Sequence, residues 1–258
     1  MSYPDLKITF LGTGTSTGVP MIGCHCEVCE STDKKDKRLR SSILVQSALT
    51  TLVIDTTPDF RYQMLREKVD KLDAVLFTHS HKDHVAGLDD VKAYNYFLKK
   101  PMEVFANAAT QEQLKREFFY IFEEKKYPGI PKINLNLIND TPFYAGDILV
   151  EPILVYHFKM PVLGFKFNKF TYITDANRID EIEKEKIKNS QTIVLNTLRK
   201  EKHISHFTLD EAIELADSLE IPNAYFTHIS HQMGLHEEVN KSLSPNRKLA
   251  WDGLILNV

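Results

Sequence analysis

The sequence has little cysteine and lacks long apolar or basic runs, and each shortage excludes a class of protein. Only three of its 258 residues are cysteine, an odd number within six positions, which is unsuited to a disulfide framework. No apolar stretch is long enough to cross a bilayer, and the amino terminus has no basic segment followed by an apolar one. We therefore expect a soluble, cytoplasmic protein with no membrane partner.

Positive charge does not predominate either, since 35 Asp and Glu outnumber 32 Lys and Arg and the formal net charge is −3. The densest basic segment is broken by two aspartates, and its cationic residues are Lys34, Lys35, Lys37, Arg38 and Arg40. We interpret it as a solvated loop, with attraction of a phosphate as the alternative. A nucleic acid polymer is therefore not the expected substrate. The length and the 43% hydrophobic content suit a single α/β domain over residues 1–258.

Short β-branched runs alternate with helical patterns along the chain. Strands are predicted over residues 7–11, 43–45, 51–54, 74–77, 103–105, 149–156, 165–167, 170–174, 193–196, 224–226 and 254–257. Helices are predicted over residues 60–68, 85–97, 111–122, 179–188 and 209–219. Thr208 and Glu211 form a capping box for the last helix. Residues 127–142 are predicted to be a loop or small insertion.

Polar clusters follow several of these strands directly, and the clearest is His79-Ser80-His81-Lys82-Asp83-His84. Sheet enzymes assemble their sites at the carboxyl ends of strands. Imidazoles and a carboxylate at this spacing are typical metal ligands. We predict two neighbouring metals, with His79 and His81 on one and with Asp83 and His84 on the other.

Three further residues at strand ends complete the predicted ligand set. His157 joins the first metal, His228 joins the second, and Asp175 bridges both, because a carboxylate has two oxygens and offsets the charge of two cations. Taken singly, each has a simpler interpretation. A strand-end histidine is commonly structural, and an aspartate after a strand commonly caps a helix.

A second predicted metal site contains the three cysteines, Cys24, Cys26 and Cys29. Tetrahedral structural zinc needs four ligands. His231 is the expected fourth because it lies three residues beyond His228, so that one turn can face both sites. His25 is the rival, although both of its neighbours are themselves predicted ligands. The alternative is three thiols that bind no metal.

The metal motifs of the metallo-β-lactamase superfamily resemble this set: H-S-H-K-D-H, a later His, a strand-ending Asp and a final T-H. In that superfamily an early aspartate, which Asp55 resembles here, orients the metal-binding loop. L-G-T-G-T-S-x-G-V-P, G-C-x-C-x-x-C and T-H-I-S-H-Q narrow the resemblance to the phosphoribosyl cyclic phosphate phosphodiesterases of phosphonate breakdown. That resemblance runs from Phe10 nearly to the end. It implies an αββα sandwich, two mixed sheets flanked by helices. It also implies two catalytic Mn²⁺ or Zn²⁺ ions, one structural Zn²⁺ and a homodimer.

The expected activity is hydrolysis of a small cyclic phosphate or nucleotide-like phosphodiester by a hydroxide bound between two metals. His206 aligns in order with the acid/base histidine proposed for that family and is expected to protonate the leaving oxygen; Asp83 counts among the catalytic residues as well as the ligands. A surface position for His206 is the simpler alternative, and His203 is close enough to be confused with it.

Other activities fit the same metal motifs. A tRNA-processing nuclease would need a basic arm, which the sequence does not show. A pyrroloquinoline quinone biosynthesis protein, a thioester hydrolase or lactonase, and a zinc-stabilised binding protein are further alternatives. The segment from Gly12 to Gly18 suggests a phosphate loop but lacks its lysine, so we interpret it as a backbone turn beside the site.

Overall fold

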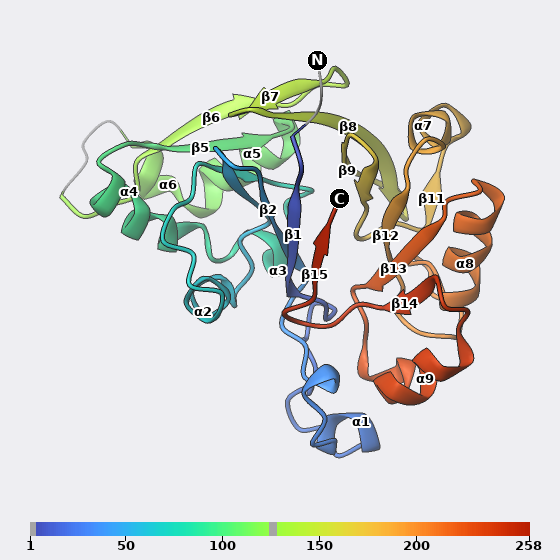
Figure 1. The fold of residues 1–258 in the computed structure, drawn as a ribbon. Helices are drawn as coiled ribbons and strands as arrows, with labels where there is room; N and C mark the ends of the chain where they lie inside the picture. The colour runs from blue at the N-terminus through green and yellow to red at the C-terminus, as the bar shows by residue number, and fades with distance from the viewer. Residues whose placement is uncertain (1–3, 124–127) are drawn as a thin grey trace.

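The computed structural model describes residues 4–123 and 128–258. Two sheets lie face to face between two layers of helices (Figure 1). The first sheet has the strand order β15-β1-β2-β3-β4-β5-β6. Its strands are β1 (Lys7–Gly12), β2 (Ser42–Gln46), β3 (Thr51–Ile54), β4 (Ala74–Leu76), β5 (Met102–Ala106), β6 (Ile133–Leu137) and β15 (Ile255–Asn257).

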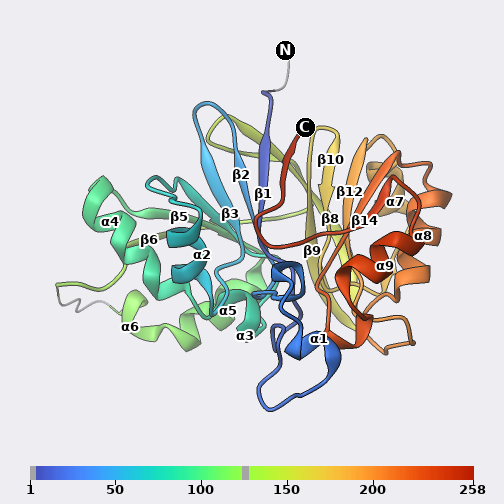
Figure 2. The same cartoon turned by 60° about the horizontal axis from the view of Figure 1, so that its bottom comes forward.

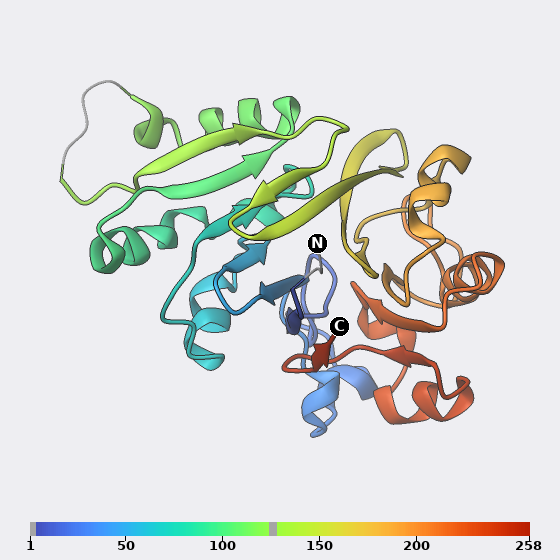
Figure 3. The same ribbon diagram turned by 45° about the horizontal axis from the view of Figure 1, so that its top comes forward.

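The second sheet has the order β11-β8-β9-β10-β12-β13-β14, with β7 paired to β8. Its strands are β7 (Phe143–Ala145), β8 (Ile148–His157), β9 (Met160–Phe167), β10 (Phe170–Tyr172), β11 (Arg178–Ile179), β12 (Thr192–Asn196), β13 (Asn223–Thr227) and β14 (Arg247–Leu249). In Figure 3 the yellow-green hairpin of β7 and β8 runs from one half of the molecule to the other. Both sheets are mixed, because β3 to β6 run parallel while β1 to β3 run antiparallel, and β10, β12, β13 and β14 run parallel while β8 to β10 run antiparallel.

Helices cover the outer face of each sheet (Figure 2). The first sheet carries α2 (Phe60–Arg66), α3 (Lys82–Val85), α4 (Lys92–Leu98), α5 (Ala108–Glu117) and α6 (Phe119–Phe122). The second carries α7 (Glu181–Ile187), α8 (Leu209–Ser218) and α9 (His236–Ser242), while α1 (Glu27–Glu30) lies near the lower end of the molecule in Figure 1. No helix in the described part of the chain is both long and apolar enough to span a membrane.

Alternation along the strands explains the layers. Ile43 and Val45 of β2 face the core between the sheets, whereas Leu44 packs with Phe60 under the outer helices. All of these side chains are at most 2% exposed. Central strands such as β2 and β3 bury both faces and form nearly continuous apolar runs, as expected for a sandwich enclosed by helices. The predicted fold class is therefore confirmed.

Several predictions of local structure are wrong in detail. Part of the segment predicted as a loop over residues 127–142 forms β6 at the edge of the first sheet; Tyr127 lies outside the described residues. The helix predicted over residues 85–97 is a 3-10 turn at Leu88–Val91 followed by α4. The basic segment is not wholly solvated, because the Arg38 side chain is buried. The capping box of α8 is present, with Glu211 N donating to Thr208 Oγ1 and Thr208 N to Glu211 Oε2.

Candidate metal centre

Two groups of predicted ligands meet where the strands end, and they share one carboxylate. The first group is His79, His81 and Asp175, and the second is Asp83, His84, Asp175 and His228. Within each group the ligand atoms lie within 4.8 Å of one another. The shared residue stands between the groups: Asp175 Oδ2 is 3.3 Å from His79 Nε2 and 3.1 Å from His84 Nε2, and its Oδ1 is 2.9 Å from His228 Nε2.

The donor set fits divalent cations. His79 Nε2 and His228 Nε2 are buried and lie close to Asp175 oxygens, but neither makes a hydrogen bond of good geometry within the described residues, as expected for nitrogens that direct their lone pairs at a metal. Imidazole nitrogen and carboxylate oxygen suit zinc and manganese. The two groups therefore match the predicted pair of metals in ligand type, and Asp175 stands where a bridging carboxylate would.

Asp55 orients the metal-binding segment, in the role predicted for it. Its buried carboxylate accepts hydrogen bonds from Thr78 N at 2.9 Å and from Thr78 Oγ1 at 2.9 Å. It also lies 2.8 Å from His84 Nδ1, which places the proton of that ring on Nδ1 and leaves Nε2 to the metal group. Sequence reasoning missed Thr78, whose hydroxyl also lies 3.0 Å from His79 Nδ1; its position directly before the His-rich hexapeptide was the available signal.

His157 lies farther from His79 and His81 than a shared metal site predicts. Its ring centroid is 5.3 Å from that of His81 and 6.2 Å from that of His79, and among the predicted ligands it alone lies outside the sets within 4.8 Å. Its Nδ1 donates to the carbonyl oxygen of Ser205 at 3.0 Å, which leaves Nε2 available. Its ligation of a metal stays a prediction.

His206 lies within the cluster and not on the surface. Its ring centroid is 4.5 Å from that of His157 and 4.7 Å from that of His228, and the side chain is 8% exposed. Its Nδ1 is buried and has no hydrogen-bond partner in the described residues. The loop that carries it is held by Phe207 N, which donates to Ala176 O at 2.9 Å beside Asp175. His203 is 5.2 Å away, ring to ring, and is less buried.

Carboxylate charge makes this pocket attractive to cations. Burial alone would lower the pKa of His228, but Asp175 and Asp83 raise it to about 9. Burial likewise opposes ionisation of Asp175, yet His228 and His84 hold the pKa of that carboxyl well below its usual range. Burial lowers the pKa of His79 to about 4, so this ring is neutral without a metal, whereas His228 would release its proton on binding one.

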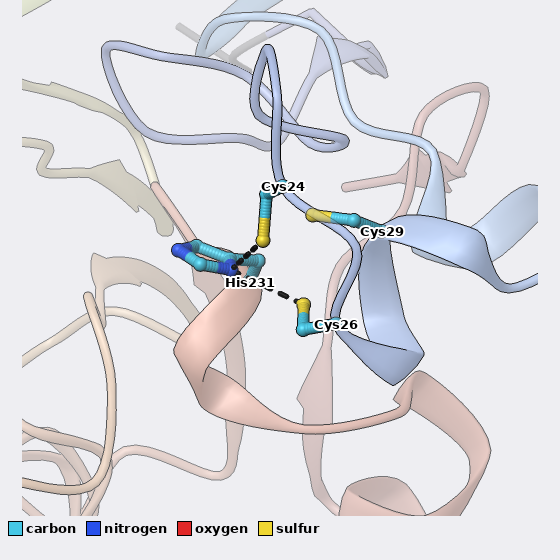
Figure 4. Close-up of side chains that lie close together, drawn as sticks. All are labelled: Cys24, Cys26, Cys29 and His231. Carbon is cyan, nitrogen blue, oxygen red and sulfur yellow. Dashed lines mark hydrogen bonds between the residues drawn. The ribbon is translucent and has the colours of Figure 1, made fainter.

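Figure 4 shows the three cysteines gathered beside His231, and α1, which contains Cys29, lies near the lower end of the molecule in Figure 1. The Sγ atoms of Cys24 and Cys26 each lie 3.3 Å from His231 Nδ1. The usual Zn–S and Zn–N lengths place such ligand atoms about 3.6 Å apart in a tetrahedron, so the cluster fits zinc. The bond to His231 is also the main cause that lowers the pKa of Cys26 to about 6, which favours its thiolate. His25 points elsewhere, to Glu30 at 3.0 Å.

Comparisons with known proteins agree with this geometry. Residues 50–229 match the family described as the beta-lactamase superfamily domain. A crystal structure of a "new diphosphatase from the PhnP family" is 37% identical and covers 98% of both chains, with a TM-score of 0.92. Zinc-bound PqqB from Methylobacterium extorquens is 19% identical, covers 98% of this chain and 100% of its own, and has a TM-score of 0.79, so it shows the fold alone.

A curated relative from Porphyromonas gingivalis, named octanoyltransferase, is 38% identical over 252 residues. The match covers 96% of this chain but 51% of the relative, so the chain spans about half of that protein's length. The family match covers more than half of the chain, and the PhnP-family diphosphatase is similar over nearly all of it. The chain therefore belongs to the metallo-β-lactamase superfamily, as a metal-dependent hydrolase that resembles the PhnP family.

Proposed function

We propose that the protein hydrolyses a phosphoester or phosphoanhydride bond in a small molecule, such as a cyclic phosphate, a nucleotide-like phosphodiester or a diphosphate diester. The observation that carries the proposal is the sharing of Asp175 by two ligand groups with His206 packed against them. Two-metal sites are common in enzymes that displace an oxygen at phosphorus. The diphosphatase named for the similar structure supports the same class of bond.

The residues divide into holding and proton-handling roles. His79, His81 and Asp175 would hold one divalent cation, and Asp83, His84, His228 and the shared Asp175 the other. When bound, these ions supply activation of water and neutralisation of the phosphoryl oxygens. The leaving oxygen also needs a proton, which a side chain of the protein would donate.

His206 is the proposed proton donor. Burial, and next the positive charge of His228, lower the pKa of His206 to about 2, so the free protein holds this ring neutral. A phosphate anion close to the ring would favour its charged form, because an opposite charge at short range raises the pKa of a histidine. A substrate phosphate beside the ring would therefore favour protonation of His206, and the His157 ring lies 4.5 Å away between ring centroids.

The test compares leaving groups in the wild type and in His206→Ala, with Mn²⁺ or Zn²⁺ added. An alkoxide such as a ribose hydroxyl needs a proton as it leaves, whereas p-nitrophenolate needs little assistance. We expect kcat to fall about 100- to 10,000-fold on cyclic nucleotides and much less on bis-p-nitrophenyl phosphate. His25→Ala is the control, because that side chain is 84% exposed and paired with Glu30. Unchanged kcat of His206→Ala on cyclic nucleotides contradicts the assigned role.

The same preparations decide between this function and the others. About three metals per chain with cleavage of a diester or diphosphate diester is the expected result. About one zinc per chain and no cleavage after manganese is added would favour a zinc-stabilised binding protein. An octanoyl thioester belongs in the substrate panel because of the name of the curated relative, and turnover of that compound alone would overturn the proposal.

A further inference from the structure

One short turn supplies a ligand to each of the two metal sites. His228 belongs to the aspartate–histidine groups, and His231, three residues later, belongs to the cysteine cluster. Ile229 between them is 2% exposed, and His228 has a left-handed backbone with φ of 57°. A displacement of this turn would therefore move ligands of both sites together.

The turn is clamped by the glycine-rich segment that follows β1. Ile229 N donates to Thr13 O at 2.9 Å, and Thr15 N donates to Ile229 O at 3.1 Å, so that Gly14 and Ile229 form a parallel bridge. These two backbone bonds are the exchange expected between neighbouring strands, although neither segment is part of a sheet. The glycine-rich segment is thus hydrogen-bonded, at Ile229, to the turn that carries His228 and His231.

Glycine is required in that segment by close approach to the chain at residues 38–40. A Cβ at Gly12 would lie 1.9 Å from Arg40 O, and one at Gly14 would lie 2.9 Å from Arg38 O. The buried Arg38 guanidinium then fixes the segment by donating to Thr13 Oγ1 at 2.8 Å. Thr13 Oγ1 in turn donates to Asp252 Oδ1 at 2.8 Å. These contacts assign the glycines to close packing, as expected for a backbone turn.

We propose that metal binding at Cys24, Cys26, Cys29 and His231 strengthens metal binding at the group Asp83, His84, Asp175 and His228. The two clamped segments, residues 13–15 and 228–231, both lead into the cysteine cluster. A metal there joins their far ends, so that the backbone bonds at Ile229 and the metal close a ring around the turn. The inference rests on the proposed function only in taking both clusters as metal sites.

The coupling is measured with metals alone, on the full chain. Metal-free protein receives one equivalent of Cd²⁺, which thiolates prefer, and ultraviolet thiolate-to-cadmium absorption confirms that the cluster is occupied. Mn²⁺, which prefers carboxylate oxygen to thiolate, is then titrated while the signal of free Mn²⁺ is followed by electron paramagnetic resonance. We expect manganese to bind about 5- to 150-fold more tightly when cadmium is present.

Reciprocity gives a second measurement on the same protein. Because coupling between two sites is mutual, manganese must tighten cadmium binding by the same factor. Equal manganese affinity with and without cadmium overturns the inference, and this comparison needs no variant. Since no cleavage is measured, that failure is distinct from failure of the proposed phosphoester hydrolysis.

Variants locate the connection. With one equivalent of cadmium added, Cys26→Ser is expected to bind manganese only as tightly as cadmium-free wild type, whereas His25→Ala, altered in the same loop but outside the cluster, should keep the full coupling. Gly14→Ala separates the segment from Arg38 O and should reduce the coupling factor towards one while cadmium still binds. Thr13→Val tests the same clamp with a smaller change. Full coupling in both clamp variants would show that the connection does not run through Ile229.

Discussion

Asp55→Asn is the sharpest test of how the metal centre is built. The carboxylate accepts from Thr78 N and Thr78 Oγ1 and holds the proton of His84 on Nδ1, at 2.8 Å. An asparagine has the same shape, and its oxygen can still accept from Thr78 N. Its amide group then faces His84 Nδ1, where it can only donate. The proton of His84 moves to Nε2, the nitrogen that lies 3.1 Å from Asp175 Oδ2 and is needed by a metal.

The magnitude follows from this change of tautomer. Loss of a partner that orients a ligand costs about 10- to 100-fold in metal affinity, which is about 1.4 to 2.7 kcal/mol. The chain remains closely packed because the substitution keeps the volume, and Asp55 is fully buried. We therefore expect the loss to appear in metal binding, and excess metal to restore much of the activity.

Manganese titration of protein whose cysteine cluster is loaded measures this loss. The matched control is Asp73→Asn, because Asp73 directly precedes the first residue of β4. Its Oδ2 accepts a hydrogen bond from Thr51 N at 3.0 Å, and its Oδ1 accepts one from Lys100 Nζ at 2.8 Å. Its metal affinity should equal that of the wild type. Manganese affinity of Asp55→Asn within twofold of the wild type would refute the role assigned to Asp55.

Three further predictions concern stability. Thr208→Ala removes the side-chain oxygen that caps α8 and should lower the free energy of unfolding by about 0.5 to 2 kcal/mol in urea titrations; no change would contradict the capping role. Gly12→Ala places a Cβ 1.9 Å from Arg40 O, so a melting temperature equal to that of the wild type would show that the close approach is not required. Burial, and next the charge of Arg38, lower the pKa of His236 from 6.5 to about 4, so the unfolded chain binds the proton first and stability falls as the pH drops through this window. His236→Gln should lose less stability than the wild type between pH 6.5 and pH 4, and equal losses would refute this account.

The meeting of the predicted ligands in two groups could be foreseen because their sequence signals are local. His79, His81, Asp83 and His84 lie in one hexapeptide, and the other groups follow strands whose carboxyl ends meet. His231 was predictable because it lies three residues beyond His228. A contact that joins distant parts of the chain leaves no such signal, so the burial of Arg38 against Thr13 and the backbone of Ala250 was missed.

The edge strand β6 was missed for a different reason. Asn134 and Asn136 lower the β-propensity of its sequence, and prolines flank it. In the structure both side chains donate to Glu103 of β5, at 2.7 and 2.8 Å. Cross-strand hydrogen bonds of this kind stabilise an edge whose outer side is polar. Tertiary pairing therefore outweighs the local preference.

Three residues of the metal centre have a strained, left-handed backbone conformation. Asp55, Asp175 and His228 all follow strands and all have positive φ, at 66°, 52° and 57°. Such a conformation costs about 1 to 3 kcal/mol in residues other than glycine, and aspartate and histidine are among the types that adopt it most readily. The left-handed residues lie in the segments that follow β3, β10 and β13, where Asp175 and His228 join one ligand group and Asp55 contacts His84 of the same group. Glycine would remove the strain but also the carboxylate or imidazole, which is why these positions serve the backbone and the metal centre with the same residue.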